Sequence, residues 1–172
     1  KTMCVFVSQS GETADTMAAL RLAKEKGCTT IAVANVLGSS ISREADHTIY
    51  TCAGPEIAVA STKAYTTQMV ILYLLATDMS MKFGEISREE YENDIKSLYK
   101  IKKKIKEVLT YSDRVEAVAD KIKNQTSMFY LGRGLDYVIA VEGALKSKEI
   151  SYIHSEAFAS GELKHGTIAL ID

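Results

Sequence analysis

The chain has 172 residues, of which 47% are hydrophobic and 25% are charged, and its formal net charge is -1. Such a chain can bury a real core, and its length fits one ordinary domain or two small ones. The near-zero charge provides no basic field, so we expect neither nucleic acid nor an anionic membrane as a partner. The longest apolar run, residues 69–76, is far shorter than the roughly 20 residues of a membrane-spanning helix, and we expect no targeting or membrane segment.

The three cysteines, Cys4, Cys28 and Cys52, are an odd number and show no C-x-x-C spacing. Two of them lie in or beside apolar, strand-like runs, so they fit small buried hydrophobic residues better than a metal or catalytic site. This usage is typical of a reduced compartment, and we therefore expect the protein to be cytoplasmic.

The first half of the chain carries the pattern strand, turn, helix, strand. Residues 3–7 form a short apolar run without alternation, which is typical of a strand covered on both faces. After a polar turn, apolar residues recur with a helical period until Gly27, and a second apolar run completes a parallel, right-handed βαβ unit. The strands expected here are residues 3–7, 30–34 and 47–51, and helices are expected to begin at residues 14 and 41 and near residue 61.

Helical patterns fill the middle of the chain, and a second α/β pattern follows them. Residues 85–124 predict two amphipathic helices, and the basic cluster at residues 100–104 fits a solvated helix face. Beyond them we expect a strand at residues 128–131, a glycine turn, a helix over residues 137–152 and a final strand-like run at residues 168–171.

These patterns predict an α/β protein in three parts. Residues 1–82 would form most of one α/β domain, residues 83–125 a helical connection, and residues 126–172 the start of a second α/β domain. Both ends of the chain look cut, because each carries an apolar, strand-like run with nothing beyond it.

The most informative local feature is the polar segment between the first strand and the first helix, Ser8-Gln-Ser-Gly-Glu-Thr13. Free backbone N–H groups at a helix N-terminus, a glycine for close approach and three hydroxyl groups suit a dianionic phosphate. The segment lacks the lysine of a Walker loop and the spacing of a dinucleotide-binding fingerprint. The alternative interpretation is an ordinary helix cap, for which serine and threonine are equally suitable.

Two further segments suggest acid–base chemistry. Glu142, Lys146 and Glu149 are spaced i, i+4 and i+7, so they share one face of a helix. A carboxylate held by a cation can move a proton between adjacent carbons, as ketose–aldose isomerisation requires, although surface salt bridges have the same spacing. His165 lies in a polar loop with glycines, where it can either titrate near neutral pH and open a sugar ring or simply be solvated.

Together these segments resemble the sugar isomerase (SIS) domains of glutamine–fructose-6-phosphate aminotransferases. The resemblance covers nearly the whole chain and is weakest through the helical connection. Ordered motifs of this length are far more specific than any of the short patterns above. The matching motifs are SQSGETADT (residues 8–16), EIAVASTKAYTTQ (56–68), LGRG (131–134), EGALKSKEISYIHSEAFASGELKHG (142–166) and the terminal IALID.

The resemblance implies a three-layer α/β/α fold with a parallel, flavodoxin-like sheet. Residues 1–82 would be a first SIS domain that lacks its N-terminal strand and helix, and a second SIS domain would be partly present from residue 126. The ligands implied are fructose 6-phosphate and glucosamine 6-phosphate, in amino sugar biosynthesis, and neither a metal nor an organic cofactor is implied. The residues implied to bind the sugar phosphate are Ser8, Gln9, Ser10, Thr13, Val59 and Ser61.

The same resemblance implies three catalytic residues. Glu149 would move a proton between C1 and C2 of the sugar, Lys146 would assist beside it, and His165 would act in ring opening. In this family the loop that carries the histidine reaches the site of a neighbouring subunit. A homodimer with an exchanged His165 loop is therefore implied.

Three parts of the family's pattern have no counterpart in this chain. They are the glutaminase domain with its N-terminal cysteine nucleophile, an upstream serine-bearing sugar loop, and a C-terminal tail whose lysine forms a Schiff base with the open ketose. We therefore expect the chain alone not to be fully active. Two other functions stay open: a non-catalytic SIS module that senses a sugar phosphate, which has no use for the acid–base residues, and a related deglycase or isomerase, which would differ upstream of Lys1.

Overall fold

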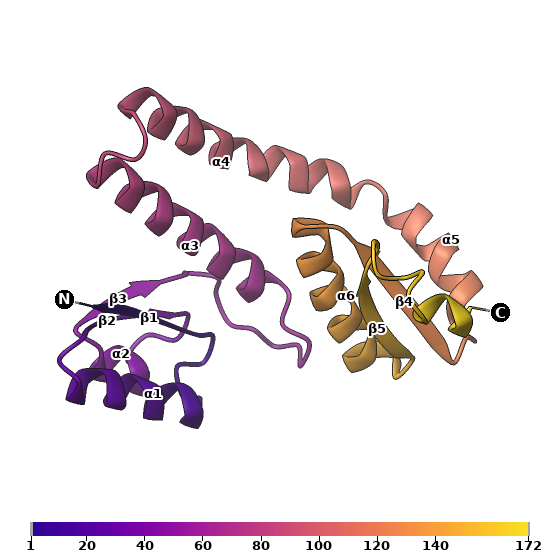
Figure 1. Cartoon of the computed structure of the whole chain (residues 1–172), viewed down its shortest axis with the longest axis horizontal. Coiled ribbons are helices and arrows are strands. Elements are labelled where there is room, and N and C mark those ends of the chain that lie inside the picture. The colour runs from indigo at the N-terminus through magenta and orange to yellow at the C-terminus, as the bar shows by residue number, and fades with distance from the viewer. Residues whose placement is uncertain (1, 172) are drawn as a thin grey trace. The chain divides into compact units, whose positions relative to one another are not determined.

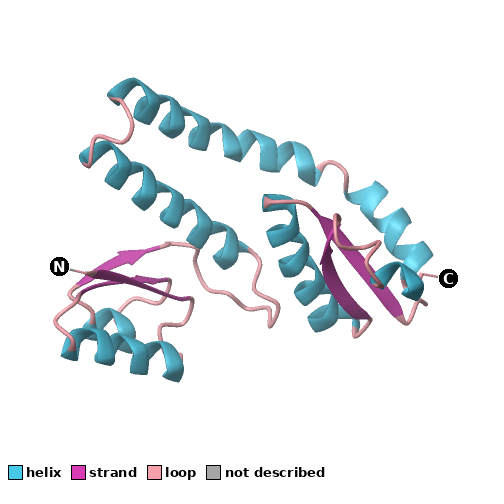
Figure 2. Ribbon diagram, viewed as in Figure 1, coloured by secondary structure: helices cyan, strands magenta, loops and turns pink. Residues whose placement is uncertain are grey.

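The structure is a computed structural model and describes residues 2–171. The chain divides into two compact units, with the boundary after Ile105. The first unit contains a three-stranded sheet and the second a two-stranded sheet, and every strand pair is parallel (Figure 1 and Figure 2). The α/β class with parallel sheets that the sequence predicts is therefore confirmed. Among the described residues, none of the helices combines the length and the apolar character that crossing a bilayer requires.

The sheet of the first unit has the order β1-β2-β3. Helices α1 and α2 follow β1 and β2 in the chain and lie on one side of this sheet (Figure 1). The helices α3 and α4 come after the third strand, and α4 continues past the boundary between the units. The elements are β1 (Met3–Ser8), α1 (Ala14–Glu25), β2 (Thr29–Ala34), α2 (Ser40–Glu44), β3 (His47–Tyr50), α3 (Lys63–Lys82) and α4 (Arg88–Leu109).

A small core joins α1 and α2 to the sheet. Ala32 and Ala34 are two residues apart on β2 and therefore point to the same face, where their short side chains let the helices approach closely. Met17 and Leu20 are three residues apart on α1, so they form one stripe that packs on this face together with Ile41 from α2. All five side chains are buried, which fixes both short helices against the strands.

The parallel register brings the carboxyl ends of the three strands to one edge of the sheet. Ser8, the last residue of β1, is opposite Ala34, and Ala34 is opposite Tyr50 at the end of β3. Ligands of open parallel sheets bind outside this edge, because the loops that leave the strands gather there. The polar segment at residues 8–13 is one of those loops.

The second unit is built around a βαβ arrangement in which α6 connects and covers the two strands. The rings of Phe129 and Phe158 meet edge to face on neighbouring strands, with their centroids 5.5 Å apart. Gly132 ends the first strand against the start of α6, where a Cβ atom would overlap the backbone of Asp136 and Tyr137. The elements are α5 (Ser112–Ile122), β4 (Ser127–Gly132), α6 (Leu135–Ser151), β5 (His154–Ala159) and a 3₁₀ helix (Thr167–Leu170).

Two features of the second unit differ from the sequence prediction. The expected strand at residues 168–171 is wrong, since Thr167–Leu170 is a 3₁₀ helix held by local bonds such as the one from Ala169 N to Gly166 O (3.0 Å). An apolar run becomes a strand only when another strand pairs with it, and within residues 2–171 this run has no such neighbour. The strand β5 (His154–Ala159), in contrast, is formed but was not predicted, because its mixed sequence HSEAFA has no clear apolar pattern.

Candidate functional site

The segment between β1 and α1 forms a tight turn, which we call the β1–α1 turn (residues 8–13). The Ser8 hydroxyl lies inside it and accepts a hydrogen bond from Gly11 N at 3.0 Å. The same hydroxyl lies 3.0 Å from Thr13 Oγ1, and the Ser10 hydroxyl accepts a bond from Glu12 N at 3.2 Å. The backbone oxygen of Gln9 accepts a bond from Asn35 N (3.1 Å) at the end of β2. The structure therefore gathers Ser8, Gln9, Ser10 and Thr13, four of the predicted site residues, in one turn at the carboxyl edge of the sheet.

The N-terminus of α1 carries no side-chain cap. Thr13 occupies the capping position, but its side chain makes no capping hydrogen bond. The first bond inside the helix runs from Met17 N to Thr13 O at 3.0 Å, so the helix provides no acceptor for the N–H groups of Ala14, Asp15 and Thr16. These donors, with the positive end of the helix dipole, suit an anion. The alternative interpretation was that these hydroxyls form an ordinary helix cap. In the structure they bond within the turn, and Thr13 makes no capping hydrogen bond to α1.

Gly11 fits the turn closely against α2. Its φ of +69° is a conformation that residues with side chains rarely adopt, and a Cβ here would lie 2.5 Å from Ser39 Cβ and 2.9 Å from Ile41 Cγ2. The backbone oxygen of Gly11 accepts a hydrogen bond from Ile41 N at 3.0 Å. Only glycine therefore allows the turn to lie this close to the start of α2.

A second pair of predicted residues lies in the loop after β3. The Val59 side chain is 97% exposed, and the Ser61 hydroxyl lies 3.4 Å from Glu56 Oε2. The same carboxylate oxygen accepts a hydrogen bond from Ala64 N (3.2 Å) in the first turn of α3. Glu56 thus ties the loop to the helix that follows. This contact was missed in the sequence, because Glu56 lies outside the capping position of α3, which is Thr62.

The structure also brings together the charged residues predicted on α6. Lys146 Nζ lies 2.8 Å from Glu149 Oε2 and 3.5 Å from Glu142 Oε1. The three side chains are only 20%, 31% and 26% exposed, respectively, so the cluster is less solvated than an ordinary surface pair. The hydrogen bond to Glu149 raises the pKa of Lys146, and the charges of both carboxylates add to this effect. Lys146 is therefore an ammonium ion held between two carboxylates at neutral pH.

Tyr130 on β4 fixes the position of α6, and this role was missed in the sequence. Its hydroxyl forms a short hydrogen bond with the Ser147 hydroxyl, next to Lys146 in the chain. The Tyr130 ring lies so close to Gly143 that a Cβ there would come within 3.1 Å of ring atom Cε1. Both contacts lie within one helical turn of the charged cluster, so they fix the orientation of α6 and of the charged side chains on it. Nothing in the sequence pattern pairs residues 130 and 147.

His165 lies in the turn after β5, where its backbone N–H bonds to Glu162 O at 3.0 Å. Its side chain is exposed and takes part in none of the side-chain hydrogen bonds or ion pairs that the structure describes for residues 2–171. The predicted residues thus fall into two local groups, the β1–α1 turn and the Lys146–Glu149 pair. Val59, Ser61 and His165 belong to loops outside these groups.

An open groove of about 400 Å³ runs between α3 and α4, and it contains none of the predicted residues. Its walls are largely apolar, with Met69, Val70, Leu98 and Ile101 among the lining residues. A ligand site usually combines an apolar wall with several convergent polar groups. We therefore place the candidate functional residues in two groups, each within one unit: the β1–α1 turn in the first unit and the α6 cluster in the second.

The fold defines the class of an α/β protein with parallel sheets. The first unit has a turn beside an uncapped helix N-terminus at the carboxyl edge of its sheet, and the second unit has a charged cluster on α6. The sequence profile of the SIS domain family matches residues 1–78 and 121–172. The chain therefore belongs to the SIS domain family.

Curated relatives agree with this family assignment. The chain is 52% identical over 172 residues to "Glutamine--fructose-6-phosphate aminotransferase [isomerizing]" of Fusobacterium nucleatum, covering 100% of the chain and 28% of that protein. It is 57% identical over 171 residues to the protein of the same name from Clostridium tetani, covering 99% of the chain and 28% of that protein. The chain thus spans only 28% of the length of these relatives.

A solved structure gives the same result. The C-terminal domain of glucosamine-fructose-6-phosphate aminotransferase from Francisella tularensis superposes with a TM-score of 0.96 at 42% sequence identity. The superposition covers 99% of the chain and 48% of that structure. The resemblance drawn from the sequence motifs, to the SIS region of this aminotransferase family, is therefore confirmed.

Proposed function

We propose that this chain is the sugar-phosphate-binding and isomerising part of a glutamine–fructose-6-phosphate aminotransferase. The observation that carries the proposal is the uncapped N-terminus of α1 beside a turn of three hydroxyl groups, at the carboxyl edge of a parallel sheet. The names of the relatives support the choice of fructose 6-phosphate as substrate. Glucosamine 6-phosphate is the product that the family resemblance implies. No step of this proposal requires a metal or an organic cofactor.

The β1–α1 turn would hold the phosphate group. Phosphate oxygens accept hydrogen bonds, and the backbone N–H groups of Ala14, Asp15 and Thr16 are donors without an acceptor in the helix. The Ser10 hydroxyl accepts a bond from Glu12 N through its oxygen, so its own hydrogen is available for a phosphate oxygen. Ser8, Gln9 and Thr13 would complete the pocket, and Val59 and Ser61 would line the sugar site.

The α6 cluster would carry out the isomerisation. Glu149 would remove a proton from C1 of the open ketose derivative and return it to C2, while the hydroxyl proton of O1 passes to the heteroatom on C2, so that C1 becomes the aldehyde carbon of the aldose. The carboxylate is suited to this task because Lys146, 2.8 Å away, holds it in one orientation. The ammonium would also stabilise the negative charge that develops on the sugar oxygen during transfer. His165 would act as the acid–base group that opens the sugar ring.

The proposal extends to assembly and location. A cytoplasmic homodimer in which the His165 loop serves the neighbouring subunit is the arrangement that the family resemblance implies. His165 is exposed in a turn of small and polar residues, and this position supports a role in the site of a neighbouring subunit.

Titration calorimetry of the chain with fructose 6-phosphate, glucosamine 6-phosphate and inorganic phosphate tests the binding step. We expect saturable binding of the sugar phosphates, weakened by about tenfold or more in Ser10→Ala because a charge-assisted hydrogen bond is lost. Ser97→Ala is the matched control, since it removes a serine hydroxyl that lines the groove between α3 and α4. Equal affinities for the wild type and Ser10→Ala, with a loss in Ser97→Ala, would move the ligand to the groove and refute the proposal.

A further inference from the structure

We infer that Glu12 is a positioning residue for the phosphate site: its carboxylate binds the start of α2 and so holds the β1–α1 turn in the shape that leaves the N-terminus of α1 open. The inference rests on the proposed function for its ligand. Its structural part, that Glu12 braces the turn, can be tested without any ligand.

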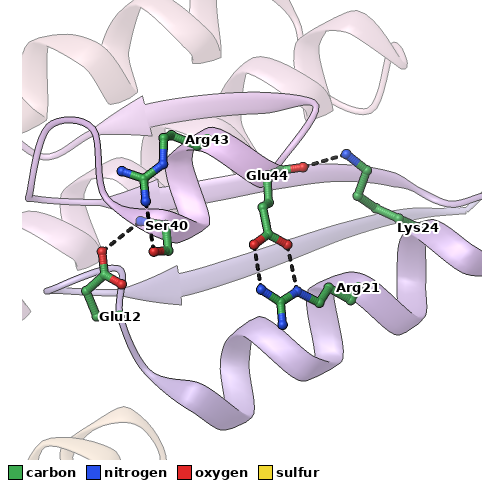
Figure 3. Close-up of polar contacts among 6 residues, drawn as sticks. All are labelled: Glu12, Arg21, Lys24, Ser40, Arg43 and Glu44. Atoms are coloured by element: carbon green, nitrogen blue, oxygen red, sulfur yellow. Dashed lines mark hydrogen bonds and ion pairs between the residues drawn. The ribbon is translucent and has the colours of Figure 1, made fainter.

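Two neighbouring residues of the turn bond to two successive N–H groups of α2. Ser40 N donates to Glu12 Oε1 at 2.8 Å (Figure 3). Ile41 N donates to Gly11 O at 3.0 Å. The first N–H groups of a helix have no acceptor of their own, so these contacts satisfy donors that would otherwise be unpaired. The hydrogen bonds from Ser40 lower the pKa of Glu12, and the charge of Arg43 lowers it further, so Glu12 is a carboxylate at neutral pH.

The segment that Glu12 binds is itself anchored independently of the turn. Ser39 and Ile41 are 2% and 0% exposed, and Ile41 belongs to the core. At the other end of α2, Glu44 accepts two hydrogen bonds from Arg21 on α1, at 2.8 and 2.6 Å (Figure 3). Arg43 also bonds to the Ser40 hydroxyl at 3.1 Å. Loss of the Glu12 side chain should therefore loosen the turn while α2 stays in place.

The charge of Glu12 makes this geometry informative. A free carboxylate in a turn that binds a dianion would repel the ligand, and Figure 3 shows the Glu12 carboxylate directed at Ser40 on α2. The Glu12 carboxylate then supports phosphate binding as a hydrogen-bond acceptor for Ser40 N, and its negative charge does not favour the phosphate. We therefore expect a specific order of affinities. Glu12→Gln, which keeps an acceptor oxygen at the same reach, should bind the sugar phosphate at least as well as the wild type, whereas Glu12→Ala should bind it more weakly.

Two measurements on the whole chain test the inference. Without ligand, amide hydrogen exchange of residues 11–13 and of Ser40 should be about tenfold faster in Glu12→Ala than in the wild type, and nearly unchanged in Glu12→Gln. With fructose 6-phosphate as the probe, calorimetry should show about tenfold weaker binding for Glu12→Ala and unchanged or tighter binding for Glu12→Gln. Glu25→Ala, which removes an exposed carboxylate at the far end of α1, is the matched control and should change neither result.

The outcomes separate this inference from the proposed function. Unchanged exchange in Glu12→Ala would overturn the brace outright. Faster exchange with unchanged affinity, in a chain that binds the sugar phosphate, would overturn the positioning role. An equal loss of affinity in Glu12→Gln and Glu12→Ala would show that the charge matters and not the acceptor, which also contradicts the inference. Faster exchange in a chain that binds no sugar phosphate at all would support the brace and refute the proposed function alone.

Discussion

Glu149→Gln should lower the isomerisation rate by about 10²- to 10⁴-fold while the affinity for fructose 6-phosphate changes by less than about threefold. The large effect on the rate is expected because the amide cannot accept the proton that the carboxylate removes from C1. The small effect on affinity is expected because the substitution keeps the size and the hydrogen-bonding reach of the side chain at the Lys146 ammonium, 2.8 Å away.

The assay needs a full-length aminotransferase, because this chain spans only 28% of the length of its relatives. We would replace the matching 171 residues of the Clostridium tetani relative with this chain and follow the formation of glucosamine 6-phosphate from fructose 6-phosphate and glutamine. Glu142→Gln is the matched control, since Glu142 contacts the same ammonium at the longer distance of 3.5 Å. Its rate should fall by less than about tenfold, because it supports Lys146 without taking the proton.

Either of two results would contradict the assignment of the base. A larger loss of rate in Glu142→Gln than in Glu149→Gln would exchange the roles of the two carboxylates. Unchanged rates in both variants would mean that the cluster is a structural ion pair, and a non-catalytic SIS module that senses sugar phosphates would then be the better description of this chain.

Gly11→Ala should destabilise the first unit by about 3 kcal/mol and abolish measurable binding of fructose 6-phosphate. The positive φ of +69° accounts for about 1 kcal/mol of this loss. Overlap of the new methyl group with the Ser39 and Ile41 side chains accounts for the rest, because both are buried and cannot move aside. Chemical denaturation followed by circular dichroism measures the first effect, and calorimetry measures the second.

Gly38→Ala separates the two contributions to this loss. Gly38 has the same φ of +69°, but nothing lies within 4 Å of the position that its Cβ would take. The free energy of unfolding of this variant should therefore fall by only about 1 kcal/mol, and its affinity for the sugar phosphate should not change. Equal losses in the two variants would show that the close fit of Gly11 against α2 contributes nothing.

The first unit could be predicted well because its signals are local. The apolar run of β1 (Met3–Ser8), the helical period of α1 (Ala14–Glu25) and the apolar run of β2 (Thr29–Ala34) each identify an element from neighbouring residues alone. The parallel pairing then follows from the handedness rule for βαβ units. The polar turn between β1 and α1 was recognisable for the same reason.

The contacts that shape the candidate site could not be predicted, because they join residues far apart in the chain. Glu12 meets Ser40 across 28 positions, and Tyr130 meets Ser147 across 17. No periodicity links such pairs, since their distance is set by the packing of whole elements. The spacing of Lys146 and Glu149, in contrast, is fixed by one helix, and their ion pair was predicted correctly.

The most direct test of the central claim, that the β1–α1 turn binds a sugar phosphate, is two-dimensional NMR of the ¹⁵N-labelled chain during titration with fructose 6-phosphate. We expect saturable shifts of the amide signals of residues 11–16, because the N–H groups of residues 14–16 would face the phosphate and residues 11–13 belong to the turn beside it. Residues lining the groove between α3 and α4, such as Val70 and Leu98, should not shift. Shifts confined to the groove, or no shift in residues 11–16 at saturating ligand, would contradict phosphate binding at the β1–α1 turn.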